Sequence, residues 1–201
     1  AMHLVCEHIN SAVPIGANSE AWLIVEAAAS SDPTEEFAAA IDSLGRLVVD
    51  VGVGVDSSSR NNLWQYREKV TEAISAKGTP HKLDVTLGAS KLAEFVTQVP
   101  SIVSAIDRGS SVYMFGHLGD GNVHVNVLGN AGDEPPEAVD AAVLEYAAKL
   151  GGSISAEHGI GVEKKPWLAH SRAEQELHLM KTLKKTMDPK NILNPGRVID
   201  I

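Results

Sequence analysis

The stretch of sequence that most constrains this fold is residues 115–127, which read Phe-Gly-His-Leu-Gly-Asp-Gly-Asn-Val-His-Val-Asn-Val. Apolar residues alternate on either side of a central Asp-Gly, and this pattern predicts two β-strands joined by a hairpin. Asp120 and Gly121 accept the positive φ angles of a two-residue type I′ turn. Such a turn would place His117 directly opposite His124, with both imidazoles within reach of one ion.

The two faces of this hairpin are predicted to differ in polarity. The period of two in a β-strand places Asn126 on the same face as His124, and Val123, Val125 and Val127 on the other face. Histidines in strands also occur as solvent-facing or hydrogen-bonded core residues, so two of them do not define a metal site. A third ligand is required.

Composition limits the classes of protein that fit this chain. Its 201 residues, 44% hydrophobic and 21% charged, suffice for one domain with a sizeable core. The formal net charge of -9 argues against binding nucleic acid or an anionic membrane through overall charge. Cys6 is the only cysteine, so an internal disulfide is excluded and a metal site must use histidine and carboxylate ligands.

The ends and the apolar runs of the sequence suggest where the protein resides. No run approaches the roughly 18 apolar residues of a membrane span, and no secretory leader pattern opens the chain. We therefore expect a cytoplasmic protein, with a peripheral membrane association left open for the full-length form. Ala1 precedes Met2 as an engineered start would, which suggests a piece of a longer protein.

The remaining patterns predict an α+β fold. Strands are predicted at 21–28, 47–51 and 153–156, with a further alternating segment at 81–87. Helices are predicted at 32–44, 56–77, 90–107, 138–150 and 172–187. This order indicates a ferredoxin-like antiparallel sheet with helices mainly on one face, plus a C-terminal helical segment. Residues 1–20 are predicted to be a lead-in and residues 21–201 to form the domain.

Two further groups of residues are candidates for a site. In the helix predicted at 56–77, Arg67 and Thr71 fall with Trp64 on the edge of the apolar stripe, where a half-buried Arg67 could bind a carboxylate. The alternative is a surface Arg67 paired with Glu68 or Glu72.

The second group is Glu157 and His158, which end a predicted strand and precede the glycines at 159 and 161. Such glycines permit a close approach of the backbone to a ligand. A surface Glu-His pair at an ordinary turn would have the same sequence. The Gly-Ile-Gly at 159–161 lacks the rest of a dinucleotide-binding pattern.

Three motifs in this order resemble a known family. They are His-x-Gly-Asp-Gly-Asn-x-His-x-Asn at 117–126, Glu-His-Gly at 157–159 and Asn-Ile-Leu-Asn-Pro-Gly at 191–196. Together they resemble the C-terminal substrate domain of the FAD-linked D-2-hydroxyacid dehydrogenases and oxidases. That group includes D-2-hydroxyglutarate dehydrogenase, the glycolate oxidase flavin subunit and cytochrome-type D-lactate dehydrogenase. The resemblance extends over about 21–201 and includes Leu-Trp-Gln-Tyr-Arg-Glu at 63–68. The FAD-binding domain that precedes this one in the family is not in the sequence.

The resemblance implies a metal centre and a catalytic base. His117, His124 and Glu157 would hold a divalent metal, zinc in the first place and manganese, iron or cobalt otherwise. His158 would be the catalytic base. Two imidazoles and one carboxylate leave open positions on such an ion for a hydroxyl and a carboxylate oxygen.

The resemblance also implies contacts to substrate and flavin. Arg67, Thr71 and Lys82 would bind the carboxylate end of the substrate, and Asn126 and Asn194 would contact the FAD. The implied reaction oxidises a small D-2-hydroxy acid to the 2-oxo acid, with hydride passing to FAD held by the protein's own N-terminal domain. This chain alone would then be inactive.

The partners and two other functions stay open at this level. By resemblance, the electron acceptor is a quinone, a cytochrome or an electron-transfer flavoprotein, and a homodimer is one assembly to consider. A metal-dependent hydrolase would use His117, His124 and Glu157 as ligands and His158 to activate water. A non-catalytic module that only binds a small acid would contain the same residues.

Overall fold

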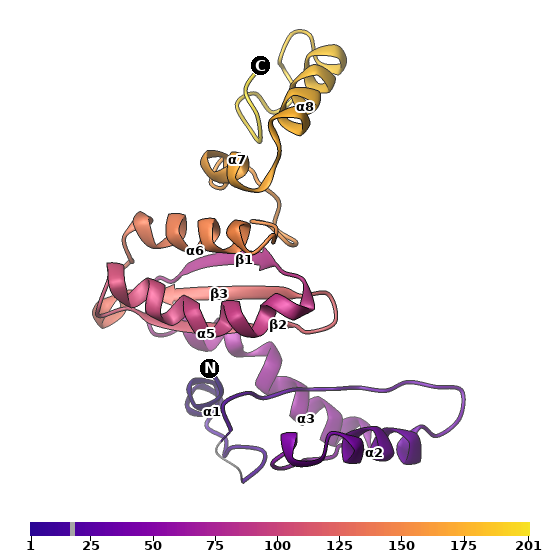
Figure 1. The fold of residues 1–201 in the computed structure, drawn as a ribbon. Coiled ribbons are helices and arrows are strands. Elements are labelled where there is room, and N and C mark those ends of the chain that lie inside the picture. The colour runs from indigo at the N-terminus through magenta and orange to yellow at the C-terminus, as the bar shows by residue number, and fades with distance from the viewer. Residues whose placement is uncertain (17–18) are drawn as a thin grey trace. The chain divides into compact units, whose positions relative to one another are not determined.

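The structure, a computed structural model, describes residues 1–16 and 19–201 (Figure 1). The chain divides into unit 1 (Ala1–Ala73) and unit 2 (Ile74–Ile201). The predicted lead-in over 1–20 includes residues 17 and 18, which lie outside the described residues. The boundary predicted after residue 20 stays a prediction.

Unit 1 is mainly helical, and polar side chains bind the backbone at the start of two of its helices, α2 (Thr34–Ser43) and α3 (Ser57–Glu68). The Asp32 carboxylate accepts hydrogen bonds from the backbone N–H and the hydroxyl of Thr34, and Asp56 and Ser59 form a capping box. Its helices are α1 (Met2–Ile9), α2, the 3-10 helix η1 (Gly45–Leu47), α3 and the first residues of α4 (Val70–Ser75). The helix predicted at 56–77 is therefore two helices, which are interrupted at Lys69.

The predicted strands at 21–28 and 47–51 are wrong. Neither segment pairs with a strand among the described residues, and apolar side chains in both are exposed, with Val25 52% and Val49 71% accessible. The physical reason is that a strand exists only with a hydrogen-bonded neighbour. Alternating β-branched residues show a tendency to extend but do not supply that neighbour.

Unit 2 contains a three-stranded antiparallel sheet. Strands β1 (His81–Thr86), β2 (Ser111–His117) and β3 (Asn122–Leu128) lie in the order β1-β3-β2. Helix α5 (Ala89–Ile106) follows β1, and helix α6 (Glu137–Lys149) follows β3. The strand predicted at 153–156 is reduced to one bridge, between Ser153 and Thr86. The chain order thus follows the ferredoxin-like βαββαβ pattern with an incomplete last strand, and the predicted α+β class is confirmed.

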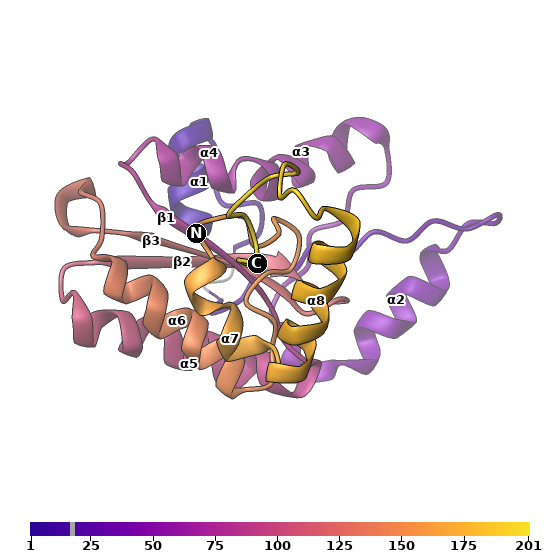
Figure 2. The same ribbon diagram turned by 90° about the horizontal axis from the view of Figure 1, so that it is seen from above.

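One face of this sheet is apolar and is covered by α5 and α6 (Figure 2). Helix α5 contributes residues at spacings of three and four, as expected for a helix packed along one stripe. The buried core combines side chains from the sheet and both helices: Leu83, Val85, Val123, Val125, Val127, Phe95, Val99, Val103, Val139, Val143, Leu144 and Ala147. The predicted covering of one face by helices is therefore confirmed, and the other face is left for polar residues.

The C-terminal helical segment is also confirmed. It comprises η3 (Lys165–Trp167), α7 (Leu168–Ser171) and α8 (Glu174–Met187). The tail contains a turn over residues 194–197, in which the N–H of Arg197 donates to the carbonyl of Asn194 at 3.3 Å and Gly196 has the positive φ, 74°, of a type II turn. None of the helices in residues 1–16 and 19–201 combines the length and apolar character that crossing a bilayer requires.

Candidate metal and substrate site

The hairpin that carries the two histidines has a different register from the predicted one. His117 pairs with Asn122 and His124 pairs with Phe115, so the predicted pairing of His117 with His124 is wrong. The loop between the strands contains four residues, 118–121, instead of two. A type I′ turn needs two positive φ angles, but in this loop only Gly121 has one, at 72°. The Asp120 carboxylate instead accepts a hydrogen bond from the backbone N–H of Asn122 at 3.0 Å.

The predicted face of the two histidines is nevertheless correct. The register differs from the prediction by two residues, and side chains alternate with a period of two, so each residue stays on its predicted face. The rings of His117 and His124 have centroids 6.0 Å apart and planes at 87°. Asn126 is on the same face as His124, as predicted.

Glu157 completes a group of three potential metal ligands. His117, His124 and Glu157 each offer a ligand atom, and these atoms lie within 4.8 Å of one another. The Nδ1 atom of His117 is 3.4 Å from Oε1 of Glu157, to which Asn122 donates a hydrogen bond of 2.6 Å. Two imidazoles and one carboxylate are a donor set that suits a zinc ion. The structure thus brings together the three residues that sequence analysis assigned to a metal.

A buried carboxylate, that of Asp84 on β1, fixes the backbone that carries Glu157 and His158. The Asp84 side chain is fully buried, and its Oδ2 accepts hydrogen bonds from three successive backbone N–H groups. The donors are Ala156 at 3.1 Å, Glu157 at 2.7 Å and His158 at 3.0 Å. Successive N–H groups that converge on one oxygen form an anion-binding concavity, which here is occupied by a side chain of the same chain.

Asp84 also faces the two histidines nearest to it. It lies directly opposite His124, and its Oδ1 is 3.5 Å from Nδ1 of that ring. Its Oδ2 is 3.9 Å from Nδ1 of His158, whose ring stacks near His124 with centroids 5.9 Å apart. Asp84, His124 and His158 form a second group with the geometry of a potential ion site. Because this group shares His124 with the first, we treat both as parts of one site.

The buried charge of Asp84 has a cationic neighbour. Burial alone would raise the pKa of Asp84, but the backbone N–H groups of His158 and Glu157 and the Lys164 ammonium hold it below its ordinary value. Lys164 is itself buried, with its Nζ 3.9 Å from Oδ2 of Asp84, and donates hydrogen bonds to the Asp84 carbonyl and to the Ser155 hydroxyl. Burial lowers the pKa of Lys164, although the negative charge of Asp84 acts to raise it.

Sequence analysis missed both Asp84 and Lys164. The alternation over 81–87 contained a signal for Asp84, because it puts this residue on the same face as Lys82 and Thr86. Nothing in the local sequence singled out Lys164.

The predicted substrate and flavin residues Lys82 and Asn126 share the polar face of the sheet with the metal ligands. They are directly opposite each other on β1 and β3. Lys82 is exposed and its Nζ donates to the Ser75 hydroxyl at 3.3 Å, whereas Asn126 is buried. An exposed ammonium on this face is available to a substrate carboxylate.

The other two predicted substrate ligands, Arg67 and Thr71, belong to unit 1. Arg67 is half-buried in the last turn of α3, as predicted, and Thr71 is exposed in α4. Glu72, one of the suggested partners of Arg67, forms an ion pair with Lys69 at 2.7 Å and lies 3.1 Å from Nε2 of His8. The role of Arg67 and Thr71 in substrate binding stays a prediction.

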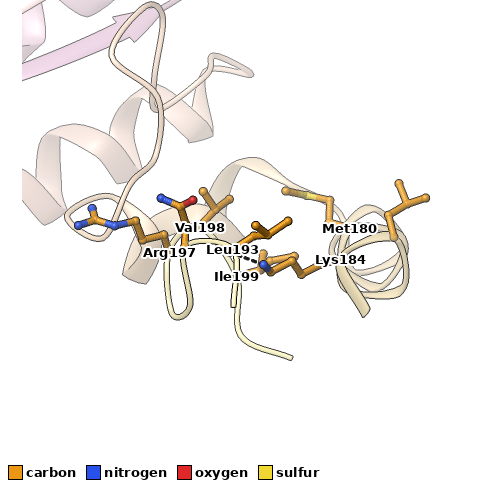
Figure 3. Close-up of a pocket in the computed structure, with 8 residues that line it drawn as sticks. Met180, Lys184, Leu193, Arg197, Val198 and Ile199 are labelled. Atoms are coloured by element: carbon orange, nitrogen blue, oxygen red, sulfur yellow. Dashed lines mark hydrogen bonds between the residues drawn. The ribbon is translucent and has the colours of Figure 1, made fainter. Parts of the chain in front are cut away.

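Asn194, a predicted flavin contact, lies in the C-terminal tail. It lines an open hollow of about 380 Å³ between α8 and the tail. In Figure 3, Lys184 reaches toward Leu193, to whose carbonyl it donates a hydrogen bond, while Arg197 extends away from them. The hollow is lined by Met180, Leu183, Lys184, Leu193, Asn194, Arg197, Val198 and Ile199. The flavin role of Asn194 therefore stays a prediction.

Two histidines and a carboxylate on the polar face of an antiparallel sheet, with a further histidine beside them, define a candidate metal-dependent active site. Residues 1–198 match the family model described as FAD linked oxidases, C-terminal domain. The chain therefore belongs to this family. Membership of this family does not support the metal-dependent hydrolase that the sequence alone left open.

Curated relatives share this family and carry related names. Over 203 residues, 98% of this chain, it is 34% identical to a mitochondrial D-2-hydroxyglutarate dehydrogenase of Rattus norvegicus, of which it covers 37%. Over 157 residues, 75% of this chain, it is 36% identical to a D-2-hydroxyglutarate dehydrogenase of Stutzerimonas stutzeri (strain A1501), of which it covers 34%. The chain thus spans about a third of the length of these relatives.

Proposed function

We propose that this chain is the substrate- and metal-binding domain of a flavin-dependent dehydrogenase that oxidises a D-2-hydroxy acid to the 2-oxo acid. The observation that carries the proposal is the convergence of His117, His124 and Glu157, with ligand atoms within 4.8 Å, beside His158. Membership of the FAD-linked oxidase family supports the flavin. The names of the relatives make D-2-hydroxyglutarate the first substrate to test, ahead of lactate and glycolate.

The three ligand residues fit a divalent ion, with zinc as the first candidate and manganese, iron and cobalt as alternatives. The side chains of His117 and Glu157 are about half exposed, at 49% and 48%, so a ligand can reach them. His124 is more enclosed, which limits its motion. A bound ion would supply a Lewis acid for the substrate hydroxyl.

His158 would accept the proton of that hydroxyl. Its side chain is 57% exposed and thus open to substrate. The Asp84 carboxylate, 3.9 Å from its Nδ1, stabilises the positive charge that the imidazole acquires when it takes a proton. Removal of this proton favours departure of the α-hydrogen as hydride, and bound FAD would supply the acceptor.

The remaining roles concern binding. Lys82 would attract the substrate carboxylate as a point charge, and Arg67 and Thr71 are further candidates for that group. Asn126 and Asn194 would contact the flavin, which the N-terminal part of the complete protein would hold. A quinone, a cytochrome or an electron-transfer flavoprotein would take the electrons onward. We further propose that the complete protein forms a homodimer and is located in the cytoplasm.

The experiment uses the complete, flavin-loaded protein and a dye as electron acceptor. We expect dye reduction with D-2-hydroxyglutarate, D-lactate or glycolate, and none with L-2-hydroxyglutarate. His158→Asn should lower turnover about 10²- to 10⁴-fold, as expected for loss of a general base, and should leave the metal content unchanged. His170→Asn, at an exposed histidine in α7, is the matched control. Full turnover of His158→Asn, or no reduction with any D-2-hydroxy acid, would overturn the proposal.

A further inference from the structure

The carboxylate of Asp84 lies against both the hairpin and the Glu157-His158 segment of the proposed site. We infer that Asp84 is a positioning residue. It fixes which ring nitrogen of His124 carries the proton, and it fixes the backbone path of residues 156–158. This inference rests on the proposed metal and substrate site. It concerns how the ligands are held before any ion binds.

Asp84 holds the backbone of residues 156–158. Glu157 and His158 have side chains that are about half exposed, so packing of those side chains does not fix them. Their backbone N–H groups, with that of Ala156, bind one buried carboxylate oxygen at 2.7 to 3.1 Å. Hydrogen bonds to an ionised acceptor are stronger than those between neutral groups. The carboxylate therefore holds the segment that presents the third ligand and the proposed base.

The other oxygen of Asp84 faces His124. Oδ1 is buried and, within residues 1–16 and 19–201, has no hydrogen-bond donor. Buried acceptors in folded proteins are normally paired. Nδ1 of His124 is 3.5 Å away, and a proton on this nitrogen is the donor that Oδ1 requires. With Nδ1 protonated, Nε2 of His124 carries the lone pair and is the nitrogen available to an ion.

The buried negative charge of Asp84 has a compensating cation. A carboxylate buried without a cation would strongly destabilise the fold. Lys164, buried and with its Nζ 3.9 Å from Oδ2, provides the compensating charge from the segment that follows residues 156–158. Asp84 can therefore stay ionised while it orients the two groups.

The test is Asp84→Asn, which changes the protonation pattern while conserving shape. The asparagine carbonyl can still accept from the three N–H groups, but its NH₂ would replace Oδ1 and donate to Nδ1 of His124. The proton of His124 must then move to Nε2, the wrong nitrogen for binding an ion. We expect zinc affinity of the chain to fall about 10- to 100-fold, the usual effect of losing such a partner. Long-range ¹H–¹⁵N spectra of the zinc-free chain should show His124 protonated at Nδ1 in the parent and at Nε2 in the variant.

Asp140→Asn is the matched control. Asp140 is a largely buried carboxylate whose Oδ1 lies 2.8 Å from Nδ1 of His81, outside the site. This variant should retain the zinc affinity and the His124 spectrum of the parent. Circular dichroism and thermal melting of all three chains check that they are folded.

The outcomes separate this inference from the proposed function. If the parent binds zinc and Asp84→Asn binds it equally well with His124 protonated as before, the inference is overturned and the metal site stands. If the parent binds no zinc, the metal site is overturned, and the spectra alone decide about Asp84. Should Asp84→Asn fail to fold, the parent spectrum decides, because protonation of His124 at Nε2 would overturn the inference.

Discussion

The side-chain amide of Asn122 donates a hydrogen bond of 2.6 Å to Oε1 of Glu157, 35 positions further along the chain. This contact connects the start of β3 to the segment that carries the third proposed ligand. The side-chain carbonyl oxygen of Asn122 is buried and has no hydrogen-bond partner among the described residues. The Asn122 side chain is therefore held mainly through its NH₂ group. Asn122 thus restrains a glutamate whose own side chain is half exposed.

Asn122→Ala should therefore weaken zinc binding and destabilise the chain. Loss of a hydrogen bond to a charged group costs about 1.5–3 kcal/mol, and the freed glutamate should lower the zinc affinity several-fold. Isothermal titration and urea unfolding would measure the two effects. Asn62→Ala, at an exposed position in α3, is the control. Equal zinc affinity of Asn122→Ala and parent would show that this contact does not position the ligand.

Replacing both hairpin histidines should abolish metal binding. We expect near-stoichiometric zinc, manganese, iron or cobalt in the purified parent by elemental mass spectrometry, and almost none in His117→Ala/His124→Ala, because one carboxylate alone holds such ions weakly. The control is His170→Ala/His178→Ala, which removes two exposed histidines. Metal retained by the hairpin variant would exclude this cluster as the binding site.

Lys82→Ala in the complete protein should raise KM for the D-2-hydroxy acid at least about tenfold, with a smaller change in kcat. The reason is that an ammonium that binds the carboxylate in both ground and transition states contributes uniform binding. Steady-state kinetics measure both constants. Lys82→Arg should restore part of the affinity. A fall in kcat with unchanged KM would mean that Lys82 acts in the chemical step.

His81 should matter for stability and not for the site. Its two ring nitrogens lie 2.8 Å from Asp140 and 3.2 Å from Glu134, at the start of β1. His81→Ala leaves the partly buried Asp140 without this partner, and we expect a loss of about 1–3 kcal/mol in the free energy of unfolding. Zinc affinity should be unchanged. His178→Ala serves as the control, and a large loss of zinc affinity in His81→Ala would contradict the prediction.

Asp188 should make the stability of the C-terminal segment depend on pH. Hydrogen bonding to the Lys184 ammonium, with the backbone N–H groups of Leu193 and Ile192, holds the pKa of Asp188 below its ordinary value. Since the folded pKa lies below the unfolded one, Asp188 stabilises the fold above about pH 4, and this stabilisation is lost as pH falls through the lowered pKa. Urea unfolding should show a higher free energy of unfolding for the parent than for Asp188→Asn at pH 7, and this difference should become smaller in acid. A difference in the free energy of unfolding that does not depend on pH would argue against this role.

The polar face of the hairpin could be predicted from sequence although its register could not. Alternation fixes which residues share a face, and an error of two residues conserves that assignment for His117, His124 and Asn126. The loop length depends on the conformation of Asp120. Its carboxylate accepts a hydrogen bond from the N–H of Asn122, and the loop has four residues instead of a two-residue turn. The shared face of the two histidines was therefore predictable, but the opposing partner of each histidine was not.

Other features depend on contacts between distant parts of the chain. The apolar segments at 21–28 and 47–51 have the composition of strands, yet pairing depends on a neighbour that local sequence does not specify. The contact of Asp84 with residues 156–158 joins β1 to the segment that follows the Ser153 bridge, more than 70 positions along the chain. An aspartate in an alternating segment is ordinary in sequence, so its importance is visible only in three dimensions.

The convergence of β1 with residues 156–158 also bears on how the chain folds. Asp84 and its three N–H donors are separated by 72 to 74 positions, so the loop between them must close before the proposed ligands are assembled. An ion that needs His117, His124 and Glu157 together would bind the completed sheet and not an early, local intermediate. Zinc would thus shift the equilibrium toward the native state by mass action, and its uptake could serve as a kinetic signal for the last stage of folding.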